Sequence, residues 1–143
     1  MSDNAMRGAV RAFGDALASR DPGRVAPCID DTIDWTVYGP VDLFPFFGPR
    51  RGKAAVIAMC GQAAAHLQFI RCEKEDALTA GDDDAGLVRL IAIDRRSGRT
   101  LSLRFAYFAH FRDGKLTTFK ALLDSLDAAE QALGREISLS AVA

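Results

Sequence analysis

The sequence predicts an α+β fold, in which a cone-shaped, curved antiparallel sheet packs against three N-terminal helices and surrounds an internal cavity. Three observations lead to this prediction. Apolar residues recur at helical spacing in the first 64 residues, the second half changes to the two-residue period of strands, and short turn signals separate the strand-like stretches. Helices that precede a run of hairpins are typical of the α+β class.

Three stretches predict the helices. The first contains an apolar stripe that follows the potential cap Ser2. Its members are Met6, Val10, Phe13 and Leu17. Asp21-Pro22 joins an N-cap to a proline at the first helical position, so a second, shorter helix is expected there. The Ala-rich stretch from Lys53 to Ala64 predicts the third helix.

Between the second and third helices, the chain predicts one strand and one irregular segment. Thr32 to Tyr38 is rich in β-branched and aromatic residues, and Gly39-Pro40 closes it. The following "GPVDLFPFFGPRRG" has too much Pro and Gly for regular structure. Because its three phenylalanines are unusual for a loop in water, we expect this loop to fold over an apolar space, and the glycines beside them are compatible with a hinged cover.

The second half predicts a meander of four antiparallel strands. The strands are "HLQFIRCEKEDALTA", "GLVRLIAID", "RTLSLRFAYFAHF" and "KLTTFKALLD", separated by "GDDDAG", "RRSG" and "DG". The last of these is a tight-hairpin signal. Ser125 to Leu133 predicts a final helix that Gly134 stops. Residues 1–134 are therefore expected to form one domain, and residues 135–143 a C-terminal tail.

Composition narrows the function classes. The net charge is -1, from 18 basic and 19 acidic residues, so no basic excess exists to hold a nucleic acid. No apolar run approaches the length of a membrane span, and no signal peptide opens the chain. Three cysteines without metal spacing are typical of core packing in a reducing compartment. We expect a soluble, cytoplasmic protein without nucleic-acid or membrane partners.

The element order and three short motifs resemble the nuclear transport factor 2-like superfamily, and within it the SnoaL-like branch. The motifs are "IDDTIDW" after two helices, "GPRRGKAAV" at the third helix, and "FRDGKLTTFKALLD" near the end. The superfamily includes ketosteroid isomerases, limonene epoxide hydrolases and polyketide cyclases, as well as binding modules. The resemblance implies the cone fold, and a reaction inside the cone if the protein is an enzyme.

The catalytic positions that this resemblance implies carry mostly unreactive residues here. The isomerase base falls on Thr36, and the oxyanion-holding tyrosine of the first helix falls on Phe13. The second acid falls on Tyr107, which keeps a hydrogen-bond donor. The arginine and the last acid of the hydrolases fall on Phe105 and Ala121. The family's acids are thus replaced at every matched position.

Strand alternation assigns the sheet residues to two faces. The inward face is almost wholly apolar and contains Val88, Leu90, Ala92, Phe105, Tyr107, Ala109, Phe119, Ala121 and Leu123. The outward face mixes charges with Ile91, Ile93 and Phe108. That face is apolar enough to favour a partner, and sheet-to-sheet dimers are common in the resembling proteins, so we expect a homodimer.

Three side chains are candidates for chemistry. Tyr107 either donates to a ligand carbonyl or satisfies its hydroxyl within the protein. Asp34 shares one face with Thr36 and Tyr38, where the three would form a polar end of the cavity. Asp124 ends the last strand, and it acts either as a base or as the cap of the final helix. His66 and His110 are the only histidines and are 44 positions apart, so no metal is expected, and no cofactor is implied.

Two functions are compatible with this sequence. In the first, the cavity binds a hydrophobic or aromatic small molecule, and an isomerase, cyclase or hydrolase moves a proton next to a carbonyl, with Asp34 or Asp124 as base and Tyr107 as donor. The expected pocket residues are Phe13, Thr36, Tyr38, Leu90, Phe105, Phe119, Ala121 and Leu123. In the second, the protein is a non-catalytic binding or dimerisation module. A carboxylate in the cavity within hydrogen-bond reach of Tyr107 would favour the enzyme.

Overall fold

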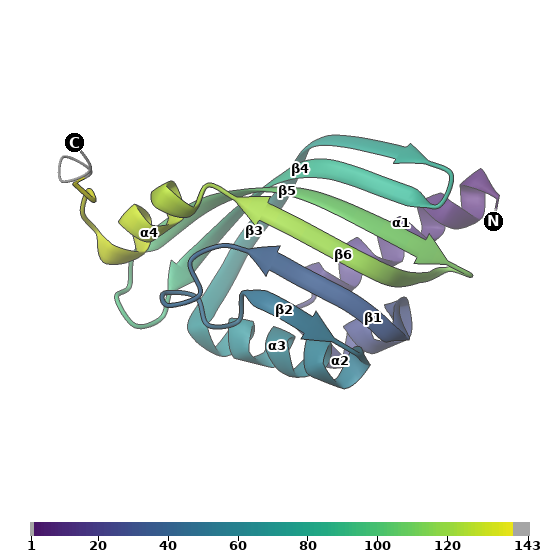
Figure 1. Ribbon diagram of the computed structural model, residues 1–143, viewed down its shortest axis with the longest axis horizontal. Coiled ribbons are helices and arrows are strands. Elements are labelled where there is room, and N and C mark those ends of the chain that lie inside the picture. Colours follow the sequence, from purple (N-terminus) through teal and green to yellow (C-terminus); the bar gives the residue numbers. More distant parts are fainter. Residues whose placement is uncertain (1, 139–143) are drawn as a thin grey trace.

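The computed structural model describes residues 2–138 of the 143-residue chain. Its helices are α1 (Asp3–Ala18), α2 (Pro22–Val25), α3 (Lys53–His66) and α4 (Ser125–Leu133), with a 3-10 turn at Ala26–Cys28. Its strands are β1 (Ile29–Tyr38), β2 (Gly48–Arg51), β3 (Leu67–Ala80), β4 (Asp83–Asp94), β5 (Thr100–Arg112) and β6 (Lys115–Leu123). Figure 1 shows α1 behind the sheet, α3 below it and α4 at the opposite end from the N-terminus.

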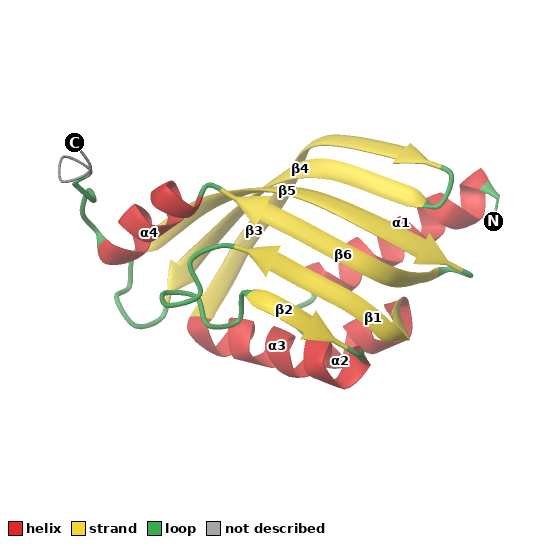
Figure 2. Cartoon of the chain, viewed as in Figure 1, coloured by secondary structure: helices red, strands yellow, loops and turns green. Residues whose placement is uncertain are grey.

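The strands form one curved, unclosed sheet in the order β2-β1-β6-β5-β4-β3. The four strands of the second half pair antiparallel in chain order, as predicted. The first strand returns beside the last, and β1 runs parallel to β6. Figure 2 shows helices lying along the concave side of the sheet while its other side carries none over its centre. The predicted α+β architecture is therefore confirmed.

One strand was not predicted. Gly48–Arg51 pairs antiparallel with β1, within the segment that the sequence predicted to be irregular throughout. Pro49 is tolerated because β2 is the edge of the sheet and needs no donor on its outer side. Gly48 and Gly52 frame the strand with positive φ angles of 94° and 89°, which let the chain enter and leave it sharply. Pairing, rather than local propensity, makes this strand.

The predicted helix boundaries are close to the observed ones. The hydroxyl of Ser2 accepts from the amide of Ala5 at the start of α1, and the carboxylate of Asp21 caps α2. Helix α3 continues two residues beyond the predicted Ala64, to His66. Gly134 ends α4 in the left-handed conformation, as predicted. Most of the expected tail, residues 139–143, lies outside the described residues.

The core lies between α1, α3 and the concave face of the sheet. Met6, Phe13 and Ala16 of α1 are buried, as are Val56, Met59 and Ala63 of α3. Opposite them lie buried sheet residues of β1, β4, β5 and β6. None of the helices in the described part of the chain is long and apolar enough to span a membrane.

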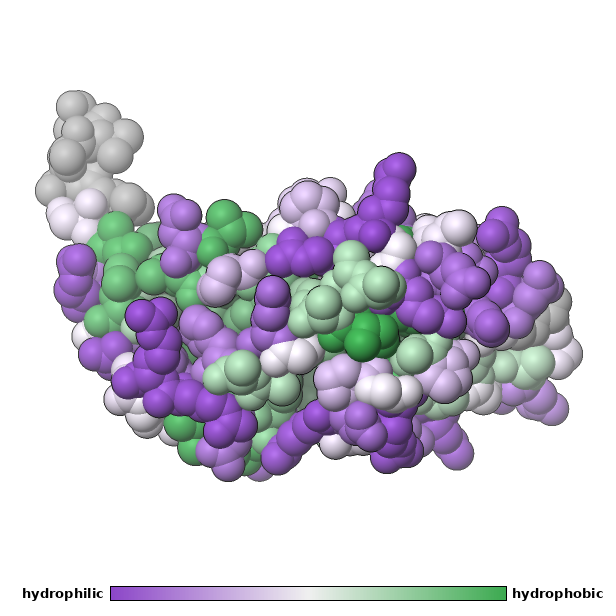
Figure 3. Space-filling view, turned by 90° about the horizontal axis from the view of Figure 1, so that it is seen from below, coloured by the Kyte–Doolittle hydropathy of each residue, from purple (hydrophilic) through white to green (hydrophobic). Residues whose placement is uncertain are grey.

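Helix α4 lies apart from the other helices and completes the end of the sheet. The amide group of Gln131 accepts from the backbone N–H of Ser102 at 2.7 Å and donates to its carbonyl at 2.9 Å. These two bonds take the place of backbone hydrogen bonds between β5 and β6, because β6 ends at Leu123 and no longer pairs with β5 there. Seen from below, Figure 3 shows apolar side chains gathering toward the end of the molecule where α4 lies.

Candidate functional site

A cavity of about 370 Å³ lies between the concave face of the sheet and helices α1 and α3. This is within the size range of small-molecule sites. Apolar side chains dominate its lining, and they come from α1, α3, β1, the segment before β2, and strands β3 to β6. The lining shows why the sequence carries so many aromatic residues at inward strand positions.

Three aromatic rings form a continuous wall of the cavity. Trp35 of β1 stacks on Phe119 of β6, with ring centres 4.2 Å apart, and Tyr107 of β5 stacks on the other side of Phe119 at 5.9 Å. Phe13 of α1 meets Trp35 and Phe119 edge-on. Such a wall offers a flat, polarisable surface to a ligand with a ring system.

The polar group of the cavity is centred on Asp84. This carboxylate is 3% exposed, and its Oδ2 accepts a hydrogen bond of 2.7 Å from the hydroxyl of Tyr107. Its Oδ1 accepts a bond of 2.8 Å from the hydroxyl of Thr79 on β3. Asp84 and Tyr107 both line the cavity, so an acid and a phenol lie together in a space whose lining is mainly apolar.

Gly86 explains how Tyr107 reaches Asp84. The two strands place Gly86 directly opposite Tyr107. A Cβ atom at Gly86 would lie 2.8 Å from the Tyr107 ring and 2.6 Å from the carbonyl oxygen of Asp76. Because no side chain occupies this position, the ring can lie across β4 and place its hydroxyl at Asp84.

The environment keeps Tyr107 protonated. Burial, the hydrogen bond to Asp84 and the nearby carboxylate charge all raise the pKa of Tyr107 above its ordinary value of 10.0. At neutral pH the hydroxyl is therefore a hydrogen-bond donor and not a base. The carboxylate of Asp84 is the group beside it that can accept a proton.

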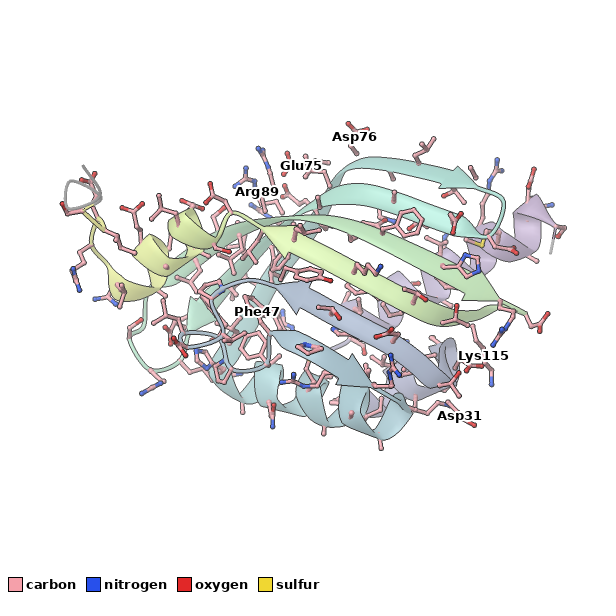
Figure 4. All side chains as sticks on the ribbon, viewed as in Figure 1. Asp31, Phe47, Glu75, Asp76, Arg89 and Lys115 are labelled. Carbon is pink, nitrogen blue, oxygen red and sulfur yellow. The ribbon has the colours of Figure 1, made fainter. Side chains whose placement is uncertain are left out.

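The phenylalanine segment closes one end of the cavity. Phe46 and Phe47 line it, and both are 5% exposed. The Arg50 side chain donates to the carbonyls of Pro45, Phe47 and Pro49, which fastens the segment to β2. Figure 4 shows Phe47 at this end and Lys115 at the opposite end of the sheet. The predicted cover over an apolar space is thus a packed wall; whether it opens stays a prediction.

Most of the predicted apolar pocket residues line the cavity. They are Phe13, Leu90, Phe105, Phe119 and Ala121, and the catalytic candidate Tyr107 also lies in the lining. Leu123 packs against the core but is not part of the lining. Its strand ends there, where the chain turns toward α4.

The placement of three polar residues was wrong. Asp34, Thr36 and Tyr38 were expected to form the polar end of the cavity, but none belongs to its lining. They lie on the outer face of β1, where Tyr38 is 51% exposed and Asp34 forms an exposed ion pair of 3.6 Å with Arg51. Burial of the alternating set Ile33, Trp35 and Val37 fixes the phase of this strand, because these side chains gain most from leaving water.

Asp124 is a helix cap. Its carboxylate accepts from the backbone N–H of Asp127 at 3.0 Å, at the start of α4. It is exposed and lies outside the cavity lining. Asp124 therefore takes the alternative role as a helix cap, and it does not lie at the cavity where a catalytic role was expected.

Neither histidine belongs to the lining of the cavity. His66 ends α3, and its ring lies 5.5 Å from that of Phe46 behind the aromatic segment. His110 is on the outer face of β5, within 2.6 Å of Asp83. The described residues contain no group of three or more His, Cys, Asp or Glu side chains that could hold a metal.

Asp84 and Trp35 are site residues that the sequence analysis missed. The inward alternation of Val88, Leu90 and Ala92 continues backwards through Gly86 to Asp84, so the signal was present. The stretch "GDDDAG" looks like a turn, and only the pairing of Asp84 with Thr79 extends the ladder into it. Trp35 lies on the buried face of β1, together with Ile33 and Val37.

A model of the SnoaL-like domain matches residues 10–119, which is most of the chain. The chain belongs to the SnoaL-like family. The matched region contains the cavity wall, Asp84 and Tyr107. The expectation drawn from the short motifs is therefore confirmed.

Solved structures agree with this assignment. A candidate isomerase from Rhodopseudomonas palustris is 40% identical, covers 89% of this SnoaL-like chain and 97% of its own, and superposes with a TM-score of 0.84. An NTF2-like protein from Burkholderia xenovorans is 20% identical, covers 92% of this chain and 98% of its own, and has a TM-score of 0.79. An LEH-like epoxide hydrolase from M. tuberculosis is 19% identical, covers 91% of this chain and 90% of its own, and has a TM-score of 0.70. The last two show the shared fold alone. Comparison with functionally curated proteins gives no significant match.

Proposed function

We propose that this SnoaL-like protein binds a small molecule with an apolar ring system and transfers a proton next to its carbonyl group. The observation that carries the proposal is the hydrogen bond of 2.7 Å between Tyr107 and the buried carboxylate of Asp84, inside an apolar cavity. A carboxylate within reach of Tyr107 is the feature that separates an enzyme from a binding module. The 40% identity to a candidate isomerase supports the same class of reaction.

The two residues have complementary roles. When a ligand enters, the Tyr107 hydroxyl turns from Asp84 to the ligand carbonyl, and Oδ2 of Asp84 loses its donor and faces the ligand. Asp84 then takes a proton from the carbon next to the carbonyl, which leaves an enolate whose oxygen accepts from Tyr107. In a ligand with a β,γ double bond the enolate is conjugated, and return of the proton to the γ carbon shifts the double bond and completes an isomerisation. Thr79 holds the second oxygen of Asp84 and orients the carboxylate.

Deuterium incorporation tests this reaction even though its product is not identified. The protein is incubated in D₂O with a panel of aromatic ketones, and exchange next to the carbonyl is followed by NMR. We expect exchange with some members, and a loss of about a hundredfold or more in Asp84→Asn. Asp83→Asn is the matched control, because Asp83 is the adjacent carboxylate on the outer face, beside His110. Undiminished exchange in Asp84→Asn would refute the proposal.

A binding module without catalysis is the second candidate. Both oxygens of Asp84 already accept a hydrogen bond from the protein, as is usual for a carboxylate that stabilises a fold. In that case the panel would bind without exchange, and Asp84→Asn would lower the melting temperature without altering any turnover.

We also propose that the outer face of the sheet joins two copies of this chain. Phe108 is 47% exposed there, and Leu122 is 55% exposed. Both signs of charge surround them, since Arg104 is paired with Glu75 at 2.8 Å and Glu75 also contacts Arg89. Figure 4 shows Glu75 and Arg89 together at this surface. An apolar centre with mixed charge around it suits a twofold contact of the face with itself.

A further inference from the structure

The charged residues that line the cavity are unequally paired. Asp84 accepts from Tyr107 and Thr79, and Asp21 accepts from the backbone N–H of Gly23 at 2.9 Å. Both acids are therefore engaged. Arg71, one of three lining cations, forms an ion pair of 2.6 Å with Glu73.

The other two lining cations are Lys74 and Arg20. Among the residues that the structure describes, Lys74 and Arg20 have no carboxylate within 4.0 Å. Lys74 lies on β3, and its ammonium group is 5.7 Å from the centre of the Tyr107 ring. Arg20 lies in the turn between α1 and α2. The positive charge of the lining is thus in excess of what the protein neutralises.

The wall of the cavity also contains an unused donor. Trp35 is 5% exposed, and its indole N–H has no acceptor in the described part of the chain. A buried donor without an acceptor is costly, because it has lost its hydrogen bond to water without replacement. Trp35 is also a lining residue, so an oxygen atom of a ligand is a candidate acceptor after a small shift of the ring.

From these observations we propose that the natural ligand is an aromatic acid, whose carboxylate is held by Lys74 and Arg20 while its ring lies on the wall of Trp35, Phe119 and Tyr107. This inference rests on the proposed function and specifies its substrate class. Lys74 and Arg20 are both exposed, so their contribution is modest in water and grows where the ligand covers the charged groups. A cationic ligand would face unpaired positive charge, and a neutral ligand would leave both cations unused.

Three probes of nearly the same shape separate these cases. Phenylpropanoate is an anion, phenylpropanol is neutral and phenylpropylammonium is a cation. Trp35 is the only tryptophan of the chain and lines the cavity, so its fluorescence reports occupancy directly. We expect phenylpropanoate to bind at least about tenfold more tightly than phenylpropanol, phenylpropylammonium to bind most weakly, and added salt to reduce the difference.

Substitution assigns the preference to the cations. Lys74→Met is expected to weaken the binding of phenylpropanoate about fivefold and to leave the affinity for phenylpropanol unchanged. Arg20→Met should act in the same direction. Lys115→Met is the matched control, because Lys115 lies at the far end of the sheet and outside the cavity lining (Figure 4). Circular dichroism confirms that each variant is folded.

The outcomes distinguish this inference from the proposed function. Equal affinity for phenylpropanoate and phenylpropanol, or no fluorescence or calorimetric response to phenylpropanoate, overturns the aromatic-acid ligand. A preference that survives in both Lys74→Met and Arg20→Met overturns their role. Neither result concerns proton transfer, which the Asp84→Asn exchange experiment tests with neutral ketones.

Discussion

Gly86 controls the position of Tyr107, because the tyrosine ring occupies the space where another residue would carry its side chain. The Tyr107–Asp84 pair is therefore set by three residues on two strands, and only two of them have reactive groups. Small residues that permit a close approach are a recurrent feature of strand interiors near sites.

Replacement of this glycine should separate the pair. In Gly86→Ala, the added Cβ would meet the Tyr107 ring at 2.8 Å and the backbone carbonyl of Asp76 at 2.6 Å. We expect loss of deuterium exchange and a destabilisation of about 1–3 kcal/mol, as for other overpacked positions. Thermal unfolding and the exchange assay measure the two effects.

Gly61→Ala is the matched control for this substitution. Gly61 lies in α3, and an added Cβ there has no neighbouring atom within 4 Å. Alanine in a helix interior should stabilise the protein by about 0.5–1 kcal/mol and leave exchange intact. If Gly86→Ala retained full exchange, the close fit between Gly86 and Tyr107 would not be required for the site.

At the scale of elements, α4 depends on its cap. The Asp124 carboxylate satisfies the free backbone N–H of Asp127, and α4 in turn supplies Gln131 to the end of β5. A weakened cap should therefore loosen both the helix and this end of the sheet.

We expect Asp124→Ala to lower the free energy of unfolding by about 1 kcal/mol, the usual cost of a lost N-cap. Asp124→Asn should retain most of the stability, because asparagine caps about as well as aspartate. Both variants should keep the deuterium exchange of the wild type. Denaturant unfolding measures the first effect; a loss of exchange in Asp124→Asn would instead restore a chemical role to this residue.

At the scale of the whole molecule, the exposed outer face bears on assembly. The helices lie along the concave side of the sheet, so Phe108 and Leu122 have no cover from the described helices. An apolar surface of this kind on a sheet favours contact with another protein surface.

Light scattering coupled to size exclusion tests the proposed homodimer. The wild type should elute with the mass of two chains, and Phe108→Asp with the mass of one, because the charge cannot be buried in an apolar contact. Val41→Asp is the control, since Val41 is 48% exposed but lies in the loop before β2, outside the strands that form this face. A monomeric wild type, or a dimeric Phe108→Asp, would contradict the proposed interface.

The sequence was sufficient for the main elements and for most of the apolar lining. Local rules act within a few residues: the Ser2 and Asp21 caps, the Gly134 stop, the hairpin at Asp113-Gly114, and the two-residue period that turns Phe105 and Tyr107 inward. Each of these signals depends on neighbours in the chain, so it can be recognised before the fold is known.

Only the tertiary structure decided the polar part of the site. Asp84 lies in a stretch that looks like a turn, and it becomes a cavity residue because Thr79 and Tyr107 from the strands on either side of it donate to it. Asp34 was placed on the wrong face, because the strand's orientation follows the burial of Trp35 and Val37 in the core. Likewise, β2 forms only because β1 pairs with it. The local pattern determines which residues can form an element, whereas contacts between distant segments determine which side chains meet.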